Sequence, residues 1–145
     1  MKTLERCNEI FSDGTFSIVP NLFNPLYTIH GLVNSSVFPL AFFLMSDRNQ
    51  SSYRSVLSSL KNLIPEFNFN RITTDFEKAT INAYQETFPN IEKQGCFSHL
   101  SQALWRKIQS ITEIRSLYTV DPEYGRYCRM LPAFAFVDPD YVVDT

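Results

Sequence analysis

Two aspartates, Asp13 and Asp75, lie where runs of β-forming residues bend or end, in the segments IFSDGTF (residues 10–16) and RITTDF (residues 71–76). If the two strands are parallel neighbours, both carboxylates converge near the carboxyl ends of adjacent strands, where ligand sites of open α/β sheets gather. Two carboxylates at short range repel each other unless a cation lies between them. Hard oxygen ligands suit Mg²⁺ or Mn²⁺, and two such ions about 3.5–4 Å apart support phosphoryl transfer.

Both aspartates also have ordinary structural interpretations. Asp13-Gly14 is a common turn dipeptide. Thr74 and Glu77 have the spacing of a capping box, and Asp75 would then only favour the helix dipole. Spacing alone favours these structural roles over a metal site.

The elements that must position these aspartates begin with three strands. The segments Glu9 to Val19, Leu26 to Val33 and Val37 to Met45 are rich in β-forming residues and are joined by short turns, which predicts an antiparallel meander. Pro39 cannot donate a backbone hydrogen bond, so we expect the third strand at a sheet edge.

The hydrophobic period then changes, and helices alternate with short strands. In order, the pattern predicts a helix from Tyr53 to Ile64 capped by Ser51-Ser52, a strand from Phe69 to Thr74, a helix from Phe76 to Thr87, a strand from Ile91 to Phe97 and a helix from Leu100 to Ile111. Beyond Ser116 the pattern weakens, with helical pieces near Asp121 to Met130 and one more helix after Pro139.

This order of elements predicts an α/β protein with an RNase H-like mixed five-stranded sheet. Three antiparallel strands come first, and strands four and five, joined by a helix, should be parallel. In this fold strand one lies in mid-sheet, beside strand four and parallel to it. Helices flank the sheet, and the C-terminal part is helical.

The composition of the 145-residue chain fits one globular domain. Hydrophobic residues at 44% and charged residues at 19% exclude a disordered or collagen-like chain. The net charge of −2 argues against a strongly basic nucleic-acid coat, and three widely spaced cysteines favour a reducing compartment. The longest apolar run, Val37 to Met45, is too short to span a membrane, and the polar first residues show no secretory signal.

Several short blocks, in their order and spacing, resemble the Mutator-like element (MULE) transposase domain. They are SDGTF at residues 12–16, LYTIHG at 26–31, PLAFFL at 39–44, TDFEKA at 74–79, GCFSHL at 95–100 and QALWRKIQ at 102–109. The resemblance covers about residues 9–137 and is looser toward its end.

The resemblance implies a catalytic core that cuts and rejoins DNA with a DDE triad of metal-binding acids. Asp13 matches the first acidic position and Asp75 the second, so both are expected to be catalytic and to bind Mg²⁺ or Mn²⁺. Cys96 and His99 match the Cys-x-x-His signature of the family. Cys96 is expected to end the fifth strand in the core. His99 is expected to be catalytic, either bordering the active site or positioning the scissile phosphate or the third acid. As zinc ligands the two make only half a site.

The third acid of the family follows a helical insertion, and we assign none here. The candidates are Glu113, Glu123, Asp138, Asp140 and Asp144, and the equivalent glutamate is expected beyond Thr145. Residues 1–145 are therefore interpreted as a single, incomplete MULE catalytic domain without a zinc-dependent DNA-binding module. We expect the chain alone to be inactive.

Basic residues gather late in the chain, at Arg106, Lys107, Arg115, Arg126 and Arg129. They could contact DNA phosphates, although a solvated helical face is the simpler interpretation. Trp105 could stack on a base, but its helical spacing beside Leu104 and Ile108 favours a place at the core edge.

The partners implied by the resemblance are the element ends and target DNA in intact relatives. The chain could also form a homo-oligomer. No membrane partner is expected, and the expected location is the nucleus. The alternative function is a decayed or domesticated, non-catalytic RNase H-like binding protein in which the aspartates are remnants. A different RNase H-like nuclease is disfavoured by the Cys-x-x-His segment and the Gln-x-x-Trp-Arg-Lys that follows it.

Overall fold

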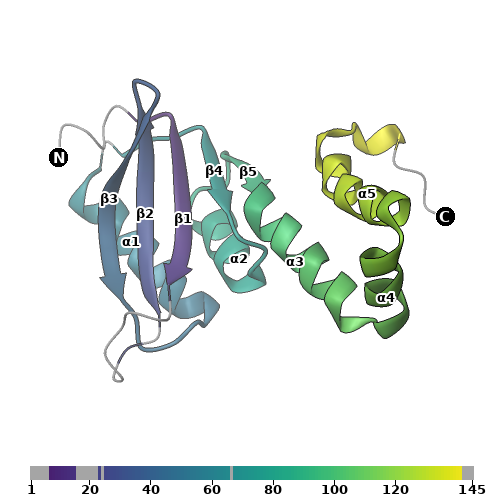
Figure 1. Cartoon of the computed structure of the whole chain (residues 1–145). Helices are drawn as coiled ribbons and strands as arrows, with labels where there is room; N and C mark the ends of the chain where they lie inside the picture. Colours follow the sequence, from purple (N-terminus) through teal and green to yellow (C-terminus); the bar gives the residue numbers. More distant parts are fainter. Residues whose placement is uncertain (1–6, 16–22, 24, 66, 142–145) are drawn as a thin grey trace. The chain divides into compact units, whose positions relative to one another are not determined.

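The computed structural model describes residues 7–15, 23, 25–65 and 67–141. The chain forms two compact units, a first unit of residues 1–95 that holds the sheet and a helical second unit of residues 96–145 (Figure 1). Within the described residues, no helix combines the length and the apolar character needed to cross a membrane.

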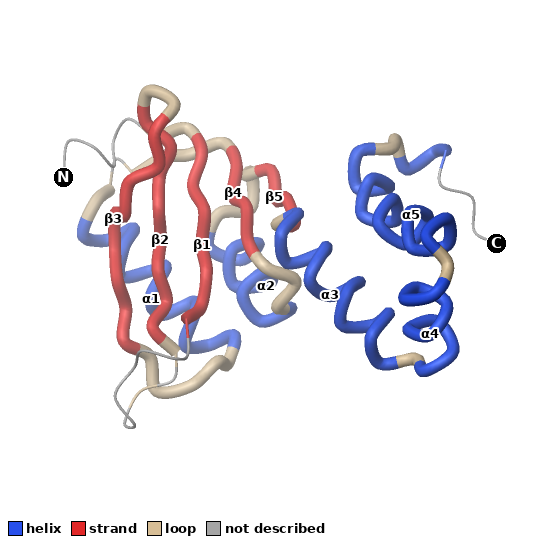
Figure 2. Tube along the Cα trace, viewed as in Figure 1, coloured by secondary structure: helices blue, strands red, loops and turns tan. Residues whose placement is uncertain are grey.

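A mixed five-stranded sheet forms the centre of the first unit (Figure 2). Its strands are β1 (Glu9–Thr15), β2 (Leu26–Val33), β3 (Ser36–Leu44), β4 (Arg71–Thr74) and β5 (Glu92–Gly95). Their spatial order is β3-β2-β1-β4-β5, with antiparallel pairing from β1 to β3 and parallel pairing of β1 with β4 and of β4 with β5. The predicted mixed sheet is confirmed, including strand one in mid-sheet beside strand four.

The edge position predicted for the proline-containing strand is also confirmed, because β3 lies at one end of the sheet. His30 pairs with Pro39 and Ile29 with Ala41, so Leu40 is the extra residue of a β-bulge. An edge and a bulge both tolerate a residue that cannot donate to the ladder. The predicted extension of β1 to Val19 falls on residues 16–19, which lie outside the described residues.

Two helices, α1 (Gln50–Leu63) and α2 (Lys78–Thr87), lie on the same face of the sheet (Figure 2). The predicted Ser51-Ser52 cap is wrong: Asn49 is the N-cap of α1, because Asp47 accepts hydrogen bonds from the Asn49 N–H and the Ser52 hydroxyl and so closes the preceding turn. Helix α2 begins at Lys78 rather than at the predicted Phe76. A turn at residues 75–77 occupies the positions between β4 and α2.

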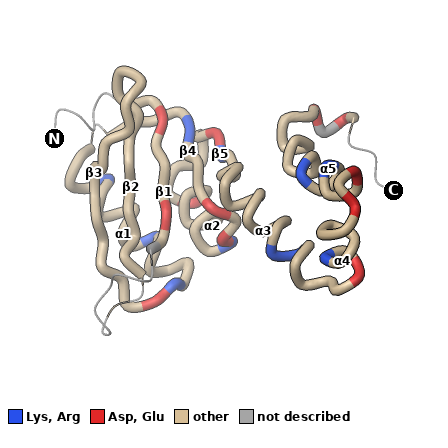
Figure 3. The backbone as a smooth tube through the Cα atoms, in the orientation of Figure 1, with Lys and Arg blue, Asp and Glu red and all other residues tan. Residues whose placement is uncertain are grey.

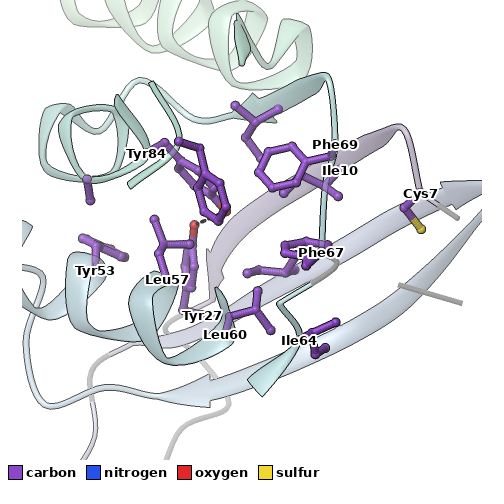
Figure 4. Packing of buried hydrophobic residues seen from close by; sticks show 14 of the residues in the cluster. Cys7, Ile10, Tyr27, Tyr53, Leu57, Leu60, Ile64, Phe67, Phe69 and Tyr84 are labelled. Atoms are coloured by element: carbon purple, nitrogen blue, oxygen red, sulfur yellow. Dashed lines mark hydrogen bonds between the residues drawn. The ribbon is translucent and has the colours of Figure 1, made fainter. Parts of the chain in front are cut away.

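The core lies between this helical layer and the sheet (Figure 4). It is a single cluster in which strand residues such as Ile10, Ile29 and Ile72 meet helix residues such as Leu57 and Ala83, all of them buried. Burying each large aliphatic side chain contributes roughly 1.5–3 kcal/mol. This packing makes the sheet a rigid base for the side chains on its other face.

The second unit consists of short helices. They are α3 (Phe97–Ser110), α4 (Thr112–Val120), α5 (Pro122–Met130) and 3₁₀ turns at Leu131–Phe136 and Pro139–Tyr141. The predicted helical C-terminal part is confirmed, although α4 was not predicted as an element; the helix predicted after Pro139 is a 3₁₀ turn up to Tyr141, and its remainder lies outside the described residues. At the start of α5, Asp121 accepts from the N–H groups of Glu123 and Tyr124, and Pro122 occupies the first turn.

Three buried tyrosines, Tyr27, Tyr53 and Tyr84, place their hydroxyl groups inside the apolar core. The Tyr27 hydroxyl donates to the Tyr84 hydroxyl at 3.1 Å (Figure 4), and the Tyr27 ring packs edge-on against Tyr53 with 5.1 Å between centroids. Burial raises the pKa of Tyr84 to about 12. Burial and the hydrogen bond to Glu77 raise the pKa of Tyr53 to about 12, and burial and the neighbouring Tyr84 raise the pKa of Tyr27 well above its usual value. All three hydroxyls therefore stay protonated in the folded protein at neutral pH.

Tyr84→Phe should make the free energy of unfolding less sensitive to alkaline pH. Folded Tyr84 keeps its proton up to about pH 12, whereas an unfolded tyrosine ionises near pH 10. The stabilisation is therefore complete below pH 10 and is lost as the pH rises toward about 12, by about 1.4 kcal/mol per pH unit. Urea unfolding across this range measures the slope, and Tyr127→Phe, at a half-exposed tyrosine, is the control. Equal slopes in wild type and Tyr84→Phe would contradict this assignment.

Candidate functional site

The parallel pairing of β1 with β4 brings Asp13, near the end of β1, and Asp75, the first residue after β4, toward the same end of two neighbouring strands. Phe11 pairs with Thr73, and the same register continued by two residues matches Asp13 with Asp75. Neighbouring strands lie about 4.8 Å apart. Figure 3 shows the acidic residues on β1 and in the segment that follows β4.

A buried hydroxyl pair supports this continuation of the register. The Ser12 hydroxyl donates to the Thr74 hydroxyl at 3.1 Å, and both side chains are buried. Ser12 also makes side-chain hydrogen bonds with Tyr27 and Tyr84. The residue before each aspartate is thus fixed in the core; Asp13 is the next residue of β1, and Asp75 is the first residue after β4.

The Asp13 side chain lies on the face of the sheet opposite to α1 and α2. Side chains alternate along a strand, and Ile10 and Ser12 point into the core, so Asp13 points away from it. Asp13 is exposed, and its backbone carbonyl accepts a hydrogen bond from the Thr28 hydroxyl at 3.2 Å. The predicted alternative of an Asp13-Gly14 turn is wrong, because both residues pair with β2 inside a continuous strand.

Asp75 is half-buried and makes a local hydrogen bond. Its Oδ1 atom accepts from the backbone N–H of Glu77 at 3.2 Å, which closes the turn before α2. The alternative capping box of Thr74 and Glu77 is wrong, because Glu77 itself is the N-cap residue and the Thr74 hydroxyl is used by Ser12. Asp75 has a structural role in this turn, and that role keeps its carboxylate at the end of β4.

The donor chemistry at this place fits a hard divalent cation. Asp13 and Asp75 offer carboxylate oxygens, and Mg²⁺ is commonly held by one or two carboxylates together with water and substrate phosphate. Within residues 7–15, 23, 25–65 and 67–141, no three His, Cys, Asp or Glu side chains are placed to hold a metal ion. Asp13 and Asp75 would therefore be the two carboxylate ligands that the described residues offer, and water and substrate would fill the other positions of an octahedral ion.

A cluster around Glu77 lies next to this site. Its Oε1 atom is 3.0 Å from Nε of Arg48, and its Oε2 atom accepts from the Tyr53 hydroxyl at 2.9 Å. The sequence interpretation assigned Glu77 only to a capping box and missed Arg48 and Tyr53. Ser12 and Thr74 were missed as well, although each directly precedes an aspartate and strand alternation would turn it toward the core.

Cys96 and His99 belong to the second unit. β5 ends at Gly95, so the prediction that Cys96 ends this strand in the core is wrong; Cys96 is the half-buried N-cap residue of α3, and its carbonyl accepts from the Leu100 N–H. His99 lies in the first turn of α3 and is half-buried. Its catalytic role stays a prediction.

The candidates for a third acid have ordinary positions in the second unit. Glu113 and Glu123 are exposed in the first turns of α4 and α5, where a negative charge favours the helix dipole. Asp138 accepts from the N–H of Asp140, and both are exposed. Asp144 lies outside the described residues. None of the four described candidates is identified by its position as the third acid.

Trp105 covers an apolar hollow of the second unit. Its ring packs edge-on against Tyr118 with 5.0 Å between centroids, and both line a cavity of about 460 Å³ with Leu104 and Ile108. The guanidinium of Arg129 lies 5.7 Å from the Tyr118 ring centroid. The late basic residues Arg106, Lys107, Arg115, Arg126 and Arg129 are all exposed, as either a solvated face or a phosphate-contacting face would require.

The chain is an α/β protein in which Asp13 lies near the end of β1 and Asp75 directly follows the parallel strand β4. Residues 10–103 match the MULE transposase domain, and the chain belongs to this family. A comparison with curated proteins gave no match. The resemblance inferred from the short sequence blocks is thereby confirmed.

The hydroxyl pair that fixes the register should behave as one unit in a double-mutant cycle. Ser12→Ala leaves the buried Thr74 hydroxyl without this partner and should cost about 1–3 kcal/mol of unfolding free energy. Adding Thr74→Val should cost less than Thr74→Val costs alone, with a coupling energy of about 1 kcal/mol. Urea unfolding measures all four proteins. Ser55→Ala, at an exposed hydroxyl, is the control, and strict additivity would contradict the pairing.

Proposed function

We propose that the chain carries the metal-binding part of a DDE-type DNA transposase core, with Asp13 and Asp75 holding one Mg²⁺ or Mn²⁺ ion. Membership of the MULE transposase family supports a transposase-related function. The observation that carries the proposal is the parallel pairing of β1 with β4, because Asp13 lies near the end of β1 and Asp75 directly follows β4.

The contribution of this chain to the chemistry is placement and negative charge. The core under the sheet fixes the backbone of β1 and β4, so Asp13 and Asp75 are held in place before any ion arrives. A divalent cation bound there supplies charge neutralisation at a phosphodiester and activation of an attacking oxygen. In such reactions most of the rate enhancement comes from positioning and electrostatic stabilisation.

The substrate that fits this proposal is DNA, with phosphodiester hydrolysis followed by strand transfer. The third acid of a DDE triad stays unassigned, because the described acids of the second unit hold ordinary helix-end positions. We therefore expect residues 1–145 alone to bind the cation without completing strand transfer. Action on chromosomal DNA implies a nuclear location.

The alternative is a non-catalytic binding protein that keeps the RNase H-like fold. Exposed apolar side chains on β3 favour it, because Val37, Phe42 and Leu44 are each more than half exposed. Apolar patches of this kind are typical of interaction surfaces. Under this alternative Asp13 and Asp75 would bind no cation.

Mn²⁺ or Mg²⁺ at millimolar concentration should raise the melting temperature of the chain. A ligand of the folded state stabilises it, by about 2.7 kcal/mol at a hundredfold excess over the dissociation constant. Asp13→Asn and Asp75→Asn should each remove most of the shift, and the second variant keeps an oxygen that can accept from the Glu77 N–H. Glu86→Gln, at an exposed glutamate of α2, should shift like wild type.

Thermal unfolding with and without the metal distinguishes the two functions. A shift that disappears in both aspartate variants and persists in Glu86→Gln supports the shared cation. No shift in wild type, or an equal shift in Asp13→Asn, would contradict it and favour the non-catalytic alternative.

His99 gives a separate prediction for the reaction itself. His99→Ala, made at the matching histidine of an intact relative, should reduce strand transfer by about a hundredfold if this side chain positions the phosphate or the third acid. A strand-transfer assay on end-labelled DNA measures the effect. Unchanged activity would remove His99 from the proposed site.

A further inference from the structure

We propose that Glu77, anchored by Arg48 and Tyr53, is a positioning residue that holds Asp75 in the orientation in which it binds the cation. This inference rests on the proposed function, because it assigns a support to one of the two metal ligands. Neither the sequence blocks nor the family match gives Glu77 such a role.

The Glu77 carboxylate is fully engaged by protein groups. Arg48 contacts one oxygen at 3.0 Å and the Tyr53 hydroxyl donates to the other at 2.9 Å. The Glu77 side chain is only 17% exposed, whereas Arg48 is 45% exposed. A half-buried ion pair with an added charge-assisted hydrogen bond holds its geometry better than a solvated surface pair.

The same residue also holds Asp75 through its backbone. The Glu77 N–H donates to Oδ1 of Asp75 at 3.2 Å, and Glu77 lies directly before α2 as its N-cap. Because the side chain of Glu77 is anchored, its peptide group, and with it the donor to Asp75, is anchored too. A carboxylate already held at one oxygen loses less freedom when it binds an ion.

Phe76 gives the turn a second anchor. A Cβ atom at Gly95 would lie 2.6 Å from the Phe76 ring, so the ring packs directly on the backbone at the end of β5. Only glycine allows this approach without a shift of the ring. The turn that carries Asp75 therefore contacts β5 through the Phe76 ring, which is 55% exposed, and is held on the other side by Arg48 and Tyr53.

Tyr53 connects Glu77 to the core, because its ring is buried there and its hydroxyl donates to the Glu77 carboxylate. It is 1% exposed, belongs to α1 and packs edge-on against Tyr27 of β2. The Tyr27 hydroxyl in turn donates to Tyr84 of α2. Support of this kind behind a metal ligand affects metal affinity by about 10–100-fold when it is removed.

The test is Mn²⁺ affinity of the full chain, measured by titration with detection of free Mn²⁺ by electron paramagnetic resonance. Glu77→Gln and Tyr53→Phe should each weaken Mn²⁺ binding by about tenfold. Tyr53→Phe decides the question, because it removes one hydroxyl, leaves the buried ring in place and does not change the net charge. It also serves if Glu77→Gln fails to fold.

The matched control is the ion pair between Arg54 of α1 and Glu86 of α2. Arg54 and Glu86 lie 3.4 Å apart and are exposed, so Glu86→Gln removes the same charge from α2 without touching the turn. It should leave Mn²⁺ affinity within about twofold of wild type. Urea unfolding in the presence of a chelator measures the structural cost of each variant separately.

Two results would overturn the inference in distinguishable ways. If Asp13→Asn abolishes Mn²⁺ binding while Tyr53→Phe and Glu77→Gln bind like wild type, the proposed function stands and the positioning role is wrong, even if both variants are less stable. If wild type binds no Mn²⁺, or binds it as well as Asp13→Asn does, both the proposed function and the positioning role are wrong.

Discussion

The parallel pairing of β1 with β4 is the constraint on which the rest of this structure depends. It joins residues as far apart in the chain as Ser12 and Thr74, and their hydroxyls meet inside the core. Because side chains alternate along a strand, the register that buries Ser12 turns Asp13 to the opposite face. A slip of one residue would exchange the two faces and bury a carboxylate, at a cost that no local contact offsets.

Much of the fold could be predicted because the hydrophobic pattern is local. The bounds of β2 agree with the sequence prediction, and so do the edge position of β3 and the mixed strand order. Helix α4 has the apolar spacing of a helix at Ile114, Leu117 and Tyr118, so its pattern was present in the sequence but was not used in the prediction. The Ser51-Ser52 cap was wrong because the controlling contact comes from Asp47, outside the helix.

The candidate site was predictable only in part. Asp13 and Asp75 lie in recognisable segments, and the parallel pairing of their strands follows from the predicted topology, whereas the register between the strands comes from the structure. The residues that hold Asp75 in place could not be predicted in this way, because Thr74 and Glu77 already form an apparently complete capping-box pattern within four residues of sequence. In the structure, Thr74 is hydrogen-bonded to Ser12, and Glu77 is hydrogen-bonded to Arg48 and Tyr53. These partners are distant in the sequence, so no local sequence pattern indicates them.

Under the proposed function, the β1–β4 pairing and the turn at residues 75–77 hold Asp13 and Asp75 in place for one hard cation in this chain of the MULE transposase family. The most direct measurement is a crystal structure of the chain grown with Mn²⁺, read from the anomalous signal of the ion. The account predicts a single peak within bonding distance of both the Asp13 and the Asp75 carboxylates. A peak on only one of them, or carboxylates that diverge with no ion between them, would contradict it.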